Sequence, residues 1–522
     1  MQSTRSSYPI SNRTSHVLRC VFLLLLIGIV VALTFNTSWQ ALAQSANWTE
    51  PAVISAPPGF SWFPDLAVDV FGSVHVVWCN TIPLEKKRGL QEQVHYTQWN
   101  GESWSPPNDI VPISADIVRN AIAADLKGNV HLLFGGSVYD TLALYYQNAP
   151  ASEAWSAAAW SAPHRINQGA SYMGDMAVDS RGVVHVVYDD MINPPDADEV
   201  TESDIFYRHS SDDGQTWSVP TRLYLEPQIT SARPCLEIDR DDVIHVTWDE
   251  GWARLAGATS DPSYGVYTSS SDGGVTWAPT TVITYPDLTV AQLTVGSNGE
   301  GRIMLVWRST LRDTILYQWS TDHGKSWTSP AVLPRVFARP WATPFDMYDM
   351  ATDSAGNIHL LVVGRRSNEQ NALLGVYHLV WDGTNWSTPT QILAEPGLYP
   401  EYPKVAIHEG NQLHAVWFTR EKDIYDAMAN RQVWYSSGLS SAPRQPVTPW
   451  PTSTPEPPTA TPSPTATITP YPTVSVSGTG LPDGLYTDND DVVRLALALS
   501  PIALLFLVLM AIRLGWFGRS RR

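Results

Sequence analysis

Apolar and polar positions along the 522-residue chain follow one motif that recurs seven times. An aspartate is followed by a short polar turn, and then by an apolar residue, a histidine, two more apolar residues and an aromatic one. The copy at Val68–Trp78 reads VDVFGSVHVVW, and the copy at Val178–Tyr188 reads VDSRGVVHVVY. The central positions of the seven copies, 54 to 60 residues apart, are His75, His131, His185, His245, Met304, His359 and His414. A fixed period of this length, built from short strands and turns, predicts a repeat architecture.

Each period divides into four short strands. An apolar run such as Asp65–Asp69 comes first, and the histidine strand follows it; both are rich in residues that favour a pleated sheet. A variable loop leads to a third strand, for example Asp204–His209, and a tight turn leads to a fourth strand that opens with tryptophan. Four strands per repeat without helical periodicity are typical of a β-propeller blade. We therefore predict an all-β fold, a seven-bladed β-propeller over residues 46–439.

The two ends of the repeat region are offset by one strand. The first tryptophan strand, Trp48–Ile54, precedes the first complete blade, whereas the last repeat ends near Val433–Ser437 without a tryptophan strand. We expect the N-terminal strand to complete the last blade and close the ring, since closure removes exposed sheet edges.

Three turns between third and fourth strands share the pattern Ser-x-Asp-x-Gly-x-Thr/Ser-Trp. They span Ser210–Trp217, Ser270–Trp277 and Ser320–Trp327. This pattern resembles the Asp-box, or bacterial neuraminidase repeat, of the sialidase superfamily. The resemblance implies a structural role, away from any catalytic face, for Asp212, Gly214, Trp217, Asp272, Gly274, Trp277, Asp322, Gly324 and Trp327.

Net charge, glycine motifs and cysteine spacing argue against several classes of function. The net charge of −18 argues against nucleic-acid binding, which needs clustered Lys and Arg. No phosphate-binding glycine motif and no zinc spacing of cysteines is present, so we predict no cofactor and no metal site. Cys79 and Cys235 fall in the first and fourth blades, too far apart for a disulfide. The repeated histidines are best explained by packing or hydrogen bonding within each blade, because Met304 fills the same position.

Both termini predict export and membrane attachment. Residues 1–43 resemble a signal peptide: Arg13 and Arg19 precede the apolar run Val21–Phe35, and an Ala-x-Ala pattern ends at Ala43. An uncleaved signal anchor is the alternative. Residues 440–490 form a linker rich in Pro, Thr and Ser, residues 492–513 a transmembrane helix, and residues 514–522 a basic cytoplasmic tail. The predicted location is therefore the cell membrane, with the propeller outside.

Candidate ligand-binding residues lie where loops join the strands on one face of the ring. The fold places three aspartates and one lysine at one equivalent position of the first strands, and three further charged residues at the ends of second strands. They are Asp65, Asp175, Asp349, Lys404, Asp189, Asp249 and Arg308. Arginines and tyrosines of the same loops are Arg119, Arg233, Arg339, Arg365, Arg366, Tyr172, Tyr264, Tyr348 and Tyr402. We expect a cluster of mixed charge at the mouth of the central channel, suited to a glycan, or to calcium if three carboxylates converge.

Two functions fit this pattern. The favoured one is a surface-anchored propeller that binds a glycan or an extracellular protein at its loop face. The alternative is an exo-glycosidase of sialidase type, which the resemblance implies would need an arginine cluster, an acid/base carboxylate and a tyrosine nucleophile paired with a glutamate. The family's Arg-Ile-Pro motif is absent, since the nearest string is Arg165-Ile166-Asn167, and six blades are usual there. No catalytic residue is therefore assigned.

Overall fold

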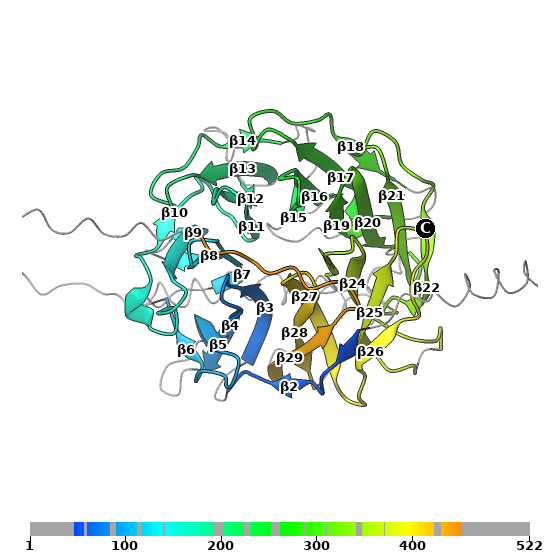
Figure 1. The fold of residues 1–522 in the computed structure, drawn as a ribbon, viewed down its shortest axis with the longest axis horizontal. Coiled ribbons are helices and arrows are strands. Elements are labelled where there is room, and N and C mark those ends of the chain that lie inside the picture. Colours follow the sequence, from blue (N-terminus) through cyan, green and yellow to red (C-terminus); the bar gives the residue numbers. More distant parts are fainter. Residues whose placement is uncertain are drawn as a thin grey trace, which may run out of the picture. The chain divides into compact units, whose positions relative to one another are not determined.

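Seven β-sheets are arranged in a ring around a central axis in the computed structural model (Figure 1). The structure describes residues 46–450 except 57–59, 84–89, 112–116, 139–140, 192–202, 224–229, 252–261, 285–288, 310, 341–346, 370 and 422–429. The predicted signal peptide, most of the linker, the transmembrane helix and the tail lie outside these residues. Among the described residues, no helix has the length and apolar character needed to cross a bilayer.

The four strand positions of the blades follow one another along the chain. The inner strands are β3 (Phe60–Val68), β7 (Ile117–Ala124), β11 (Gly174–Val178), β15 (Thr230–Ile238), β19 (Ala291–Gly299), β23 (Asp349–Thr352) and β27 (Tyr399–His408). The second strands are β4 (Val74–Pro83), β8 (Asn129–Val138), β12 (Val184–Asp190), β16 (Ile244–Gly251), β20 (Arg302–Arg308), β24 (Ile358–Gly364) and β28 (Gln412–Arg420). Each inner strand contacts the next one around the ring, and β27 contacts β3, so the ring closes.

The third and outer strands complete each blade. The third strands are β5 (Leu90–Trp99), β9 (Thr141–Pro150), β13 (Asp204–Ser210), β17 (Pro262–Ser270), β21 (Thr314–Ser320), β25 (Gly375–Trp381) and β29 (Arg431–Leu439). The outer strands of the first six blades are β6 (Asn108–Asp109), β10 (His164–Arg165), β14 (Thr221–Arg222), β18 (Thr281–Ile283), β22 (Ala331–Phe337) and β26 (Thr390–Leu393). They begin several residues after the tryptophans, which corrects the expectation that tryptophan opens the fourth strand. A 3₁₀ turn, η1 (Ala157–Ala159), precedes β10.

The N-terminal strand completes the seventh blade, as the sequence predicts. It is divided into β1 (Asn47–Trp48) and β2 (Ala52–Val53), and both pair antiparallel with β29. Trp48 lies opposite Gly438, and Val53 lies opposite Trp434. The last blade is therefore assembled from both ends of the propeller.

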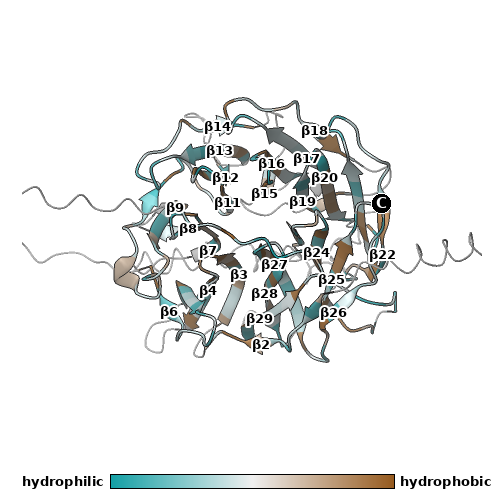
Figure 2. Ribbon diagram, viewed as in Figure 1, coloured by the Kyte–Doolittle hydropathy of each residue, from teal (hydrophilic) through white to brown (hydrophobic). Residues whose placement is uncertain are grey.

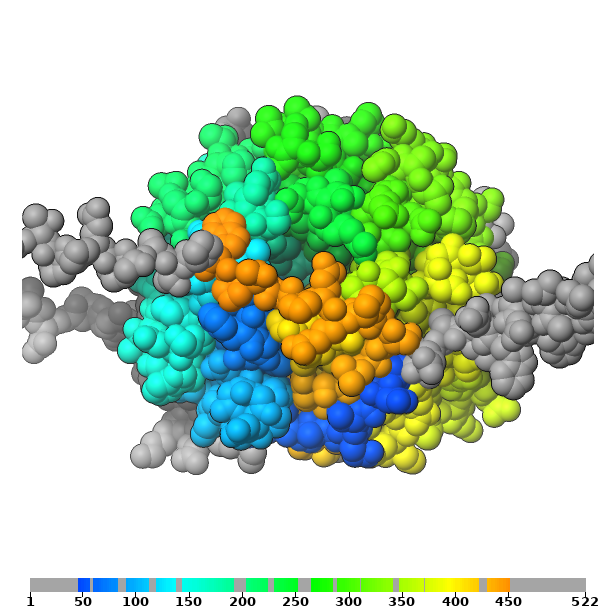
Figure 3. Space-filling model, in the orientation of Figure 1, coloured from blue at the N-terminus to red at the C-terminus, as the bar shows by residue number. Residues whose placement is uncertain are grey.

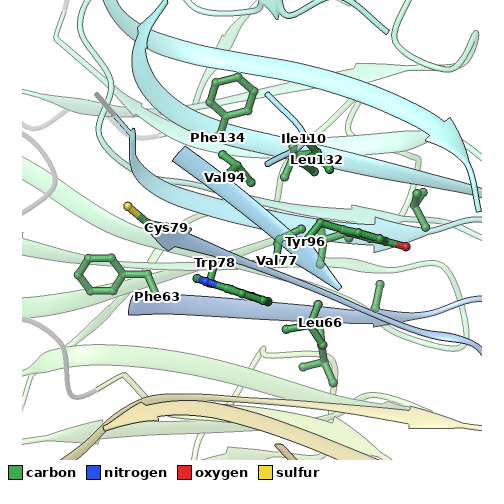
Figure 4. Close-up of a cluster of buried hydrophobic side chains, with 14 of the residues drawn as sticks. Phe63, Leu66, Val77, Trp78, Cys79, Val94, Tyr96, Ile110, Leu132 and Phe134 are labelled. Atoms are coloured by element: carbon green, nitrogen blue, oxygen red, sulfur yellow. The ribbon is translucent and has the colours of Figure 1, made fainter. Parts of the chain in front are cut away.

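The hydrophobic core lies between neighbouring blades. Trp78 and Tyr96 of the first blade and Leu132 and Phe134 of the second are fully buried in one such layer (Figure 4). Hydrophobic and hydrophilic residues are mixed within the blades (Figure 2). Burial against the adjacent blade on each side therefore holds the ring together.

Residues 440–450, predicted as the start of an extended linker, lie against the ring (Figure 3). Arg444 forms a two-pronged ion pair with Glu409 at 2.5 and 2.7 Å, in the turn between β27 and β28. The Trp450 amide donates to the Leu126 carbonyl oxygen at 2.9 Å, in the turn between β7 and β8. This segment, which we call the C-terminal strap, crosses the face that carries the turns between inner and second strands.

Candidate functional site

Seven equivalent positions, one on each inner strand, form a ring in the channel wall. Each lies opposite the residue two places after the histidine position of its second strand. The seven residues are Asp65, Ala121, Asp175, Cys235, Thr294, Asp349 and Lys404. The four predicted inner-strand residues thus share one level of the channel wall.

The ring aspartates connect adjacent blades. Asp65 accepts hydrogen bonds from the Leu66 amide and, across the blade boundary, from the Ile122 amide, both at 2.9 Å. Asp175 repeats this arrangement with its own and the next inner strand, at 3.0 and 2.9 Å. Asp349 accepts from the Val405 amide at 2.7 Å. These bonds fix the carboxylates in orientation at the channel.

Lys404 supplies positive charge to this level. Its Nζ lies 3.9 Å from Oδ1 of Asp349, and both side chains are 17% exposed. Burial alone would lower the pKa of Lys404, but Asp349, Asp175 and Asp65 hold that pKa well above its usual value. Burial raises the pKa of Asp65 to about 6 and that of Asp349 to about 7, while Lys404 opposes both shifts. At neutral pH the lysine is therefore charged and Asp349 is shared between its acid and base forms.

A cup opens above this charged level at the start of the inner strands. Its non-atom space amounts to about 380 Å³ when the open solvent at its mouth is included. Asp175, Asp349 and Lys404 line it together with Tyr402 and Met347. Tyr402 is held at a β-bulge with φ of 53°, a conformation that non-glycine residues adopt rarely. The cup therefore combines ionic groups, a phenol and apolar wall residues.

Glu237 is a channel residue that the sequence analysis missed. It lies two residues beyond the ring position Cys235 and opposite His245. Burial raises the pKa of Glu237 well above its usual value, and Asp349 adds to this effect. The equivalent residues of the other blades are Ala67, Ala123, Ala177, Gly296, Ala351 and Ala406. Glu237 could have been identified from the sequence, because it is an acidic residue at a position where the other six blades have alanine or glycine.

The predicted residues at the ends of second strands are buried in the wall. Asp189 is fully buried and accepts from the Tyr172 and Met173 amides at 3.0 and 2.8 Å. Asp249 is also fully buried, accepts from the Leu293 amide at 3.0 Å and pairs with Arg233 at 2.7 Å. These contacts give Asp249 a role in holding inner strands and Asp189 a role in holding the loop before β11, and their ligand binding stays a prediction. Arg308 is 1% exposed and donates to the Arg339 carbonyl oxygen at 3.0 Å.

The loop arginines are directed into the wall of the propeller. Arg339 and Arg420 converge on Glu401, which has no exposed surface, with the shortest contacts at 3.2 and 2.5 Å. Arg365 pairs with Asp313 at 2.9 Å. Arg339 and Arg420 thus meet at this carboxylate.

Two further arginines of this set contact aromatic or backbone groups. The guanidinium carbon of Arg119 lies 3.4 Å from the centre of the Phe63 ring. Burial lowers the pKa of Arg119 to about 10, so it remains charged. Arg366 donates to the Pro389 carbonyl oxygen at 3.2 Å.

The repeated histidines form buried hydrogen-bond chains inside the blades, as expected. In the third blade, His185 Nδ1 lies 2.7 Å from the Tyr207 hydroxyl, and its Nε2 lies 3.4 Å from Asp179. The Tyr207 hydroxyl donates to the Gly273 carbonyl oxygen of the next blade at 3.1 Å. The histidines therefore connect an inner-strand turn to the Asp-box of the following blade.

The Asp-box residues are structural, and they lie on the face opposite the cup. Asp212 accepts hydrogen bonds from the Ser210 hydroxyl at 2.8 Å and from the Thr216 hydroxyl at 2.5 Å. These bonds lower the pKa of Asp212 to about 2, and Asp272 and Asp322 repeat the arrangement. Trp217 packs edge-on against Tyr146 of the preceding blade, with ring centres 5.2 Å apart. The other box residues, at the same places in their blades, are Gly214, Gly274, Trp277, Gly324 and Trp327.

Cys79 and Cys235 are both buried thiols. Cys79 accepts a hydrogen bond from the Trp62 indole at 3.1 Å, and Cys235 Sγ lies 3.4 Å from Thr294 Oγ1. The two cysteines do not form a disulfide with each other, as predicted. Within the described residues, no group of three or more His, Cys, Asp or Glu residues is arranged to hold a metal ion.

Comparison with solved structures finds several distant matches. A Dyadobacter fermentans protein of unknown function is 12% identical, with a TM-score of 0.48, and the match covers 76% of this chain and 99% of that one. The NanB sialidase of Streptococcus pneumoniae is 13% identical, with a TM-score of 0.43 and coverage of 76% and 70%. An ulvan lyase, from a new family of polysaccharide lyases, is 12% identical, with a TM-score of 0.49 and coverage of 72% and 94%.

Sequence comparison identifies the family. No curated protein matches the chain significantly. The family model described as a BNR repeat-like domain matches residues 139–415, just over half of the 522 residues. This match includes the three Asp-box turns and the inner strands that carry Asp175 and Asp349. The chain, which folds as a seven-bladed propeller, therefore belongs to the BNR repeat-like domain family.

Proposed function

We propose that this protein binds a glycan in the cup at the mouth of its central channel. The observation that carries the proposal is the convergence of Asp175, Asp349, Lys404 and Tyr402 on one concave space. Ligand sites are concave, and they combine apolar walls with a few oriented polar groups. Fixed carboxylates, an ammonium group and a phenol offer acceptors and donors for adjacent sugar hydroxyls.

A second candidate is glycoside hydrolysis, and one observation favours it. The pKa of Asp349 is raised by burial to about 7, which lets a carboxylic acid donate a proton near neutral pH. The arginines give less support to the sialidase-type reaction. Arg339 and Arg420 are engaged with Glu401, and Arg233 is engaged with Asp249, so these guanidinium groups are occupied inside the wall.

Binding and turnover can be separated with the full-length chain in lipid nanodiscs. A glycan array followed by calorimetry should give saturable binding that Lys404→Met and Asp175→Asn weaken by about tenfold or more, as expected for charge-assisted hydrogen bonds. Glu102→Gln, an exposed change in the turn between β5 and β6, serves as the control and should bind normally. Release of sugar from a panel of glycosides, abolished in Asp349→Asn, would favour the hydrolase. Binding only to extracellular proteins, without their glycans, would contradict both candidates.

We also propose that residues 492–513 anchor the propeller in the membrane, with the basic tail in the cytoplasm. The apolar span Leu495–Ile512 and the arginines after it support this orientation. Removing Leu495–Arg522 should release a folded propeller into the soluble fraction after signal cleavage. If the truncated protein stayed with the membrane, the C-terminal anchor would be ruled out.

A further inference from the structure

The channel wall beside the cup contains more negative than positive groups. Asp65, Asp175 and Asp349 belong to the ring of equivalent positions, and Glu237 lies one step farther along the channel. Lys404 is the cation that faces them, and three of these carboxyls, with Asp349 first, raise its pKa. Arg119, which also lies near Tyr402, is stacked on Phe63 at 3.4 Å. A ligand entering the cup therefore meets an excess of carboxyl groups.

Tyr402 adds an aromatic group to this cup. Its side chain is 6% exposed and lines the cup. The β-bulge at which it lies, with φ of 53°, turns it away from the regular alternation of the strand. The phenol is therefore positioned at the cup, close to Lys404.

Lys404 shows that the carboxylates and the aromatic ring at this site accommodate an ammonium group. Its ammonium lies 3.9 Å from Asp349 and 5.9 Å from the centre of the Tyr402 ring. Carboxylates and the face of an aromatic ring both attract a cation. One lysine does not balance the carboxyls, since Asp175 still raises the pKa of Asp65 and of Asp349. A second ammonium group would relieve this repulsion.

We infer that the cup recognises the ammonium group of an amino sugar, with Asp175 and Asp349 as acceptors and Tyr402 beside it. This inference rests on the proposed glycan binding and specifies the class of sugar. A sugar that carries a carboxylate would meet the same groups with the wrong charge, and like charges at close range cost binding energy. The cup should therefore discriminate by charge between sugars of similar shape.

Calorimetry on the full-length chain in nanodiscs tests the charge preference. The probes are a glucosamine trimer, its fully N-acetylated counterpart and a galacturonic acid trimer, each at pH 7. We expect the amine to bind about tenfold tighter than the N-acetylated trimer, and the acid to bind weakest. Asp175→Asn and Asp349→Asn should remove the preference, and Tyr402→Phe, which deletes only the hydroxyl, should weaken amine binding severalfold. Glu102→Gln should keep the preference, and thermal unfolding of each variant checks that it is folded.

A proton-release measurement gives a second readout. The titratable groups that line the cup or interact with its charges are Asp65, Asp175, Cys235, Glu237, Tyr348, Asp349, Tyr402, Lys404 and Arg119. A bound ammonium lowers the pKa of a nearby carboxyl, so binding at pH 7 should release protons, mostly from Asp349. The binding enthalpy should then depend on the ionisation enthalpy of the buffer, and this dependence should vanish in Asp349→Asn.

The outcomes separate this inference from the proposed function. Equal affinity for the amine and N-acetylated trimers, sensitive to the cup variants, would overturn the inference and keep the glycan site. Tightest binding of the acid trimer would also overturn it. Binding that no cup variant alters, or no binding of any glycan, would overturn both.

Discussion

At the scale of single residues, one hydrogen-bond chain explains why the sequence repeats histidine. In the third blade it runs from His185 to Tyr207 and then to Gly273 of the next blade, and Asp179 lies 3.4 Å from the other ring nitrogen of His185. His185, Tyr207 and Asp179 are buried, so the loss of one partner leaves another buried polar group unsatisfied. Met304 shows that a buried apolar residue can take the place of the histidine. The repeated histidine is therefore explained by a buried network of polar contacts and does not indicate catalysis.

Removing one hydroxyl tests the strength of this network. Tyr207→Phe deletes the contacts to His185 and Gly273, at 2.7 and 3.1 Å. It should lower stability by about 2 kcal/mol, since each hydrogen bond contributes about 1 kcal/mol. Tyr317→Phe is the matched control, because its blade carries Met304 in the histidine position and offers no such chain. Thermal unfolding should show a clearly smaller loss for the control, and equal losses would contradict the network.

Replacing Asp349 or Asp272 by asparagine should shift the unfolding temperature in opposite directions. The pKa of Asp349 is raised by burial to about 7, so its ionisation costs stability as pH rises from about 4 through 7. Asp349→Asn should therefore raise the unfolding temperature at pH 8 relative to wild type, and change it little at pH 4. Hydrogen bonds lower the pKa of Asp272 to about 2, which makes its ionised form stabilising above pH 4. Asp272→Asn should lower the unfolding temperature at pH 8, and a shift of the same sign in both variants would contradict these assignments.

At the scale of elements, the Asp-box turn fits its neighbour closely. Gly274 has φ of +86°, and a Cβ built there would lie 2.1 Å from the Tyr207 hydroxyl oxygen. The following tryptophan, Trp277, packs edge-on against the same tyrosine at 4.9 Å between ring centres. The turn therefore works as a contact between blades as well as a connection between strands.

Gly101 and Gly274 have similar backbone conformations but different surroundings. Substituting each of them therefore distinguishes the cost of backbone strain from the cost of a steric clash. Gly101 has φ of +96° and open space around the Cβ position, whereas Gly274 faces Tyr207. Gly101→Ala should cost about 1 kcal/mol from backbone strain alone. Gly274→Ala should cost more, because the tyrosine must move and give up its bonds. Equal unfolding temperatures for the two variants would show that the turn does not depend on this contact.

The elements that repeat were predictable, and the contacts across blades were not. The period of the histidine motif predicts the blade count, and Trp48–Ile54 predicts ring closure. The same register correctly places Asp65, Asp175, Asp349 and Lys404 at one level. The burial of Asp189 could not be predicted, because its partners belong to a loop before the inner strand. Glu237 was missed since its importance depends on residues of other blades that meet it in the channel.

At the scale of the whole molecule, both ends of the ring meet in the seventh blade. The ring closes without a covalent link, through the pairing of β1 and β2 with β29. Aromatic contacts repeat at the blade boundaries, and Trp48 supplies one of them by packing edge-on against His378 at 5.2 Å between ring centres. The strap then continues from β29 and joins the turns of blades seven and two. Closure therefore depends on a short N-terminal segment held by few contacts.

Weakening this closure should open the seventh blade before any other. Trp48→Ala removes the contact with His378 and should destabilise β1, so that the Ser437 and Val433 amides of β29 lose the bonds that they donate to the Thr49 and Ser55 hydroxyls at 3.0 Å. Hydrogen exchange followed by mass spectrometry should show faster exchange in Arg431–Leu439, because local opening follows the weakest cooperative unit. Trp217→Ala is the matched control: it loses the equivalent contact with Tyr146, but its outer strand is covalently continuous with its own blade. Exchange should rise only near the mutated turn in this control. Unchanged exchange in β29 of Trp48→Ala would mean that the strand pairs alone, without the tryptophan, keep the ring closed.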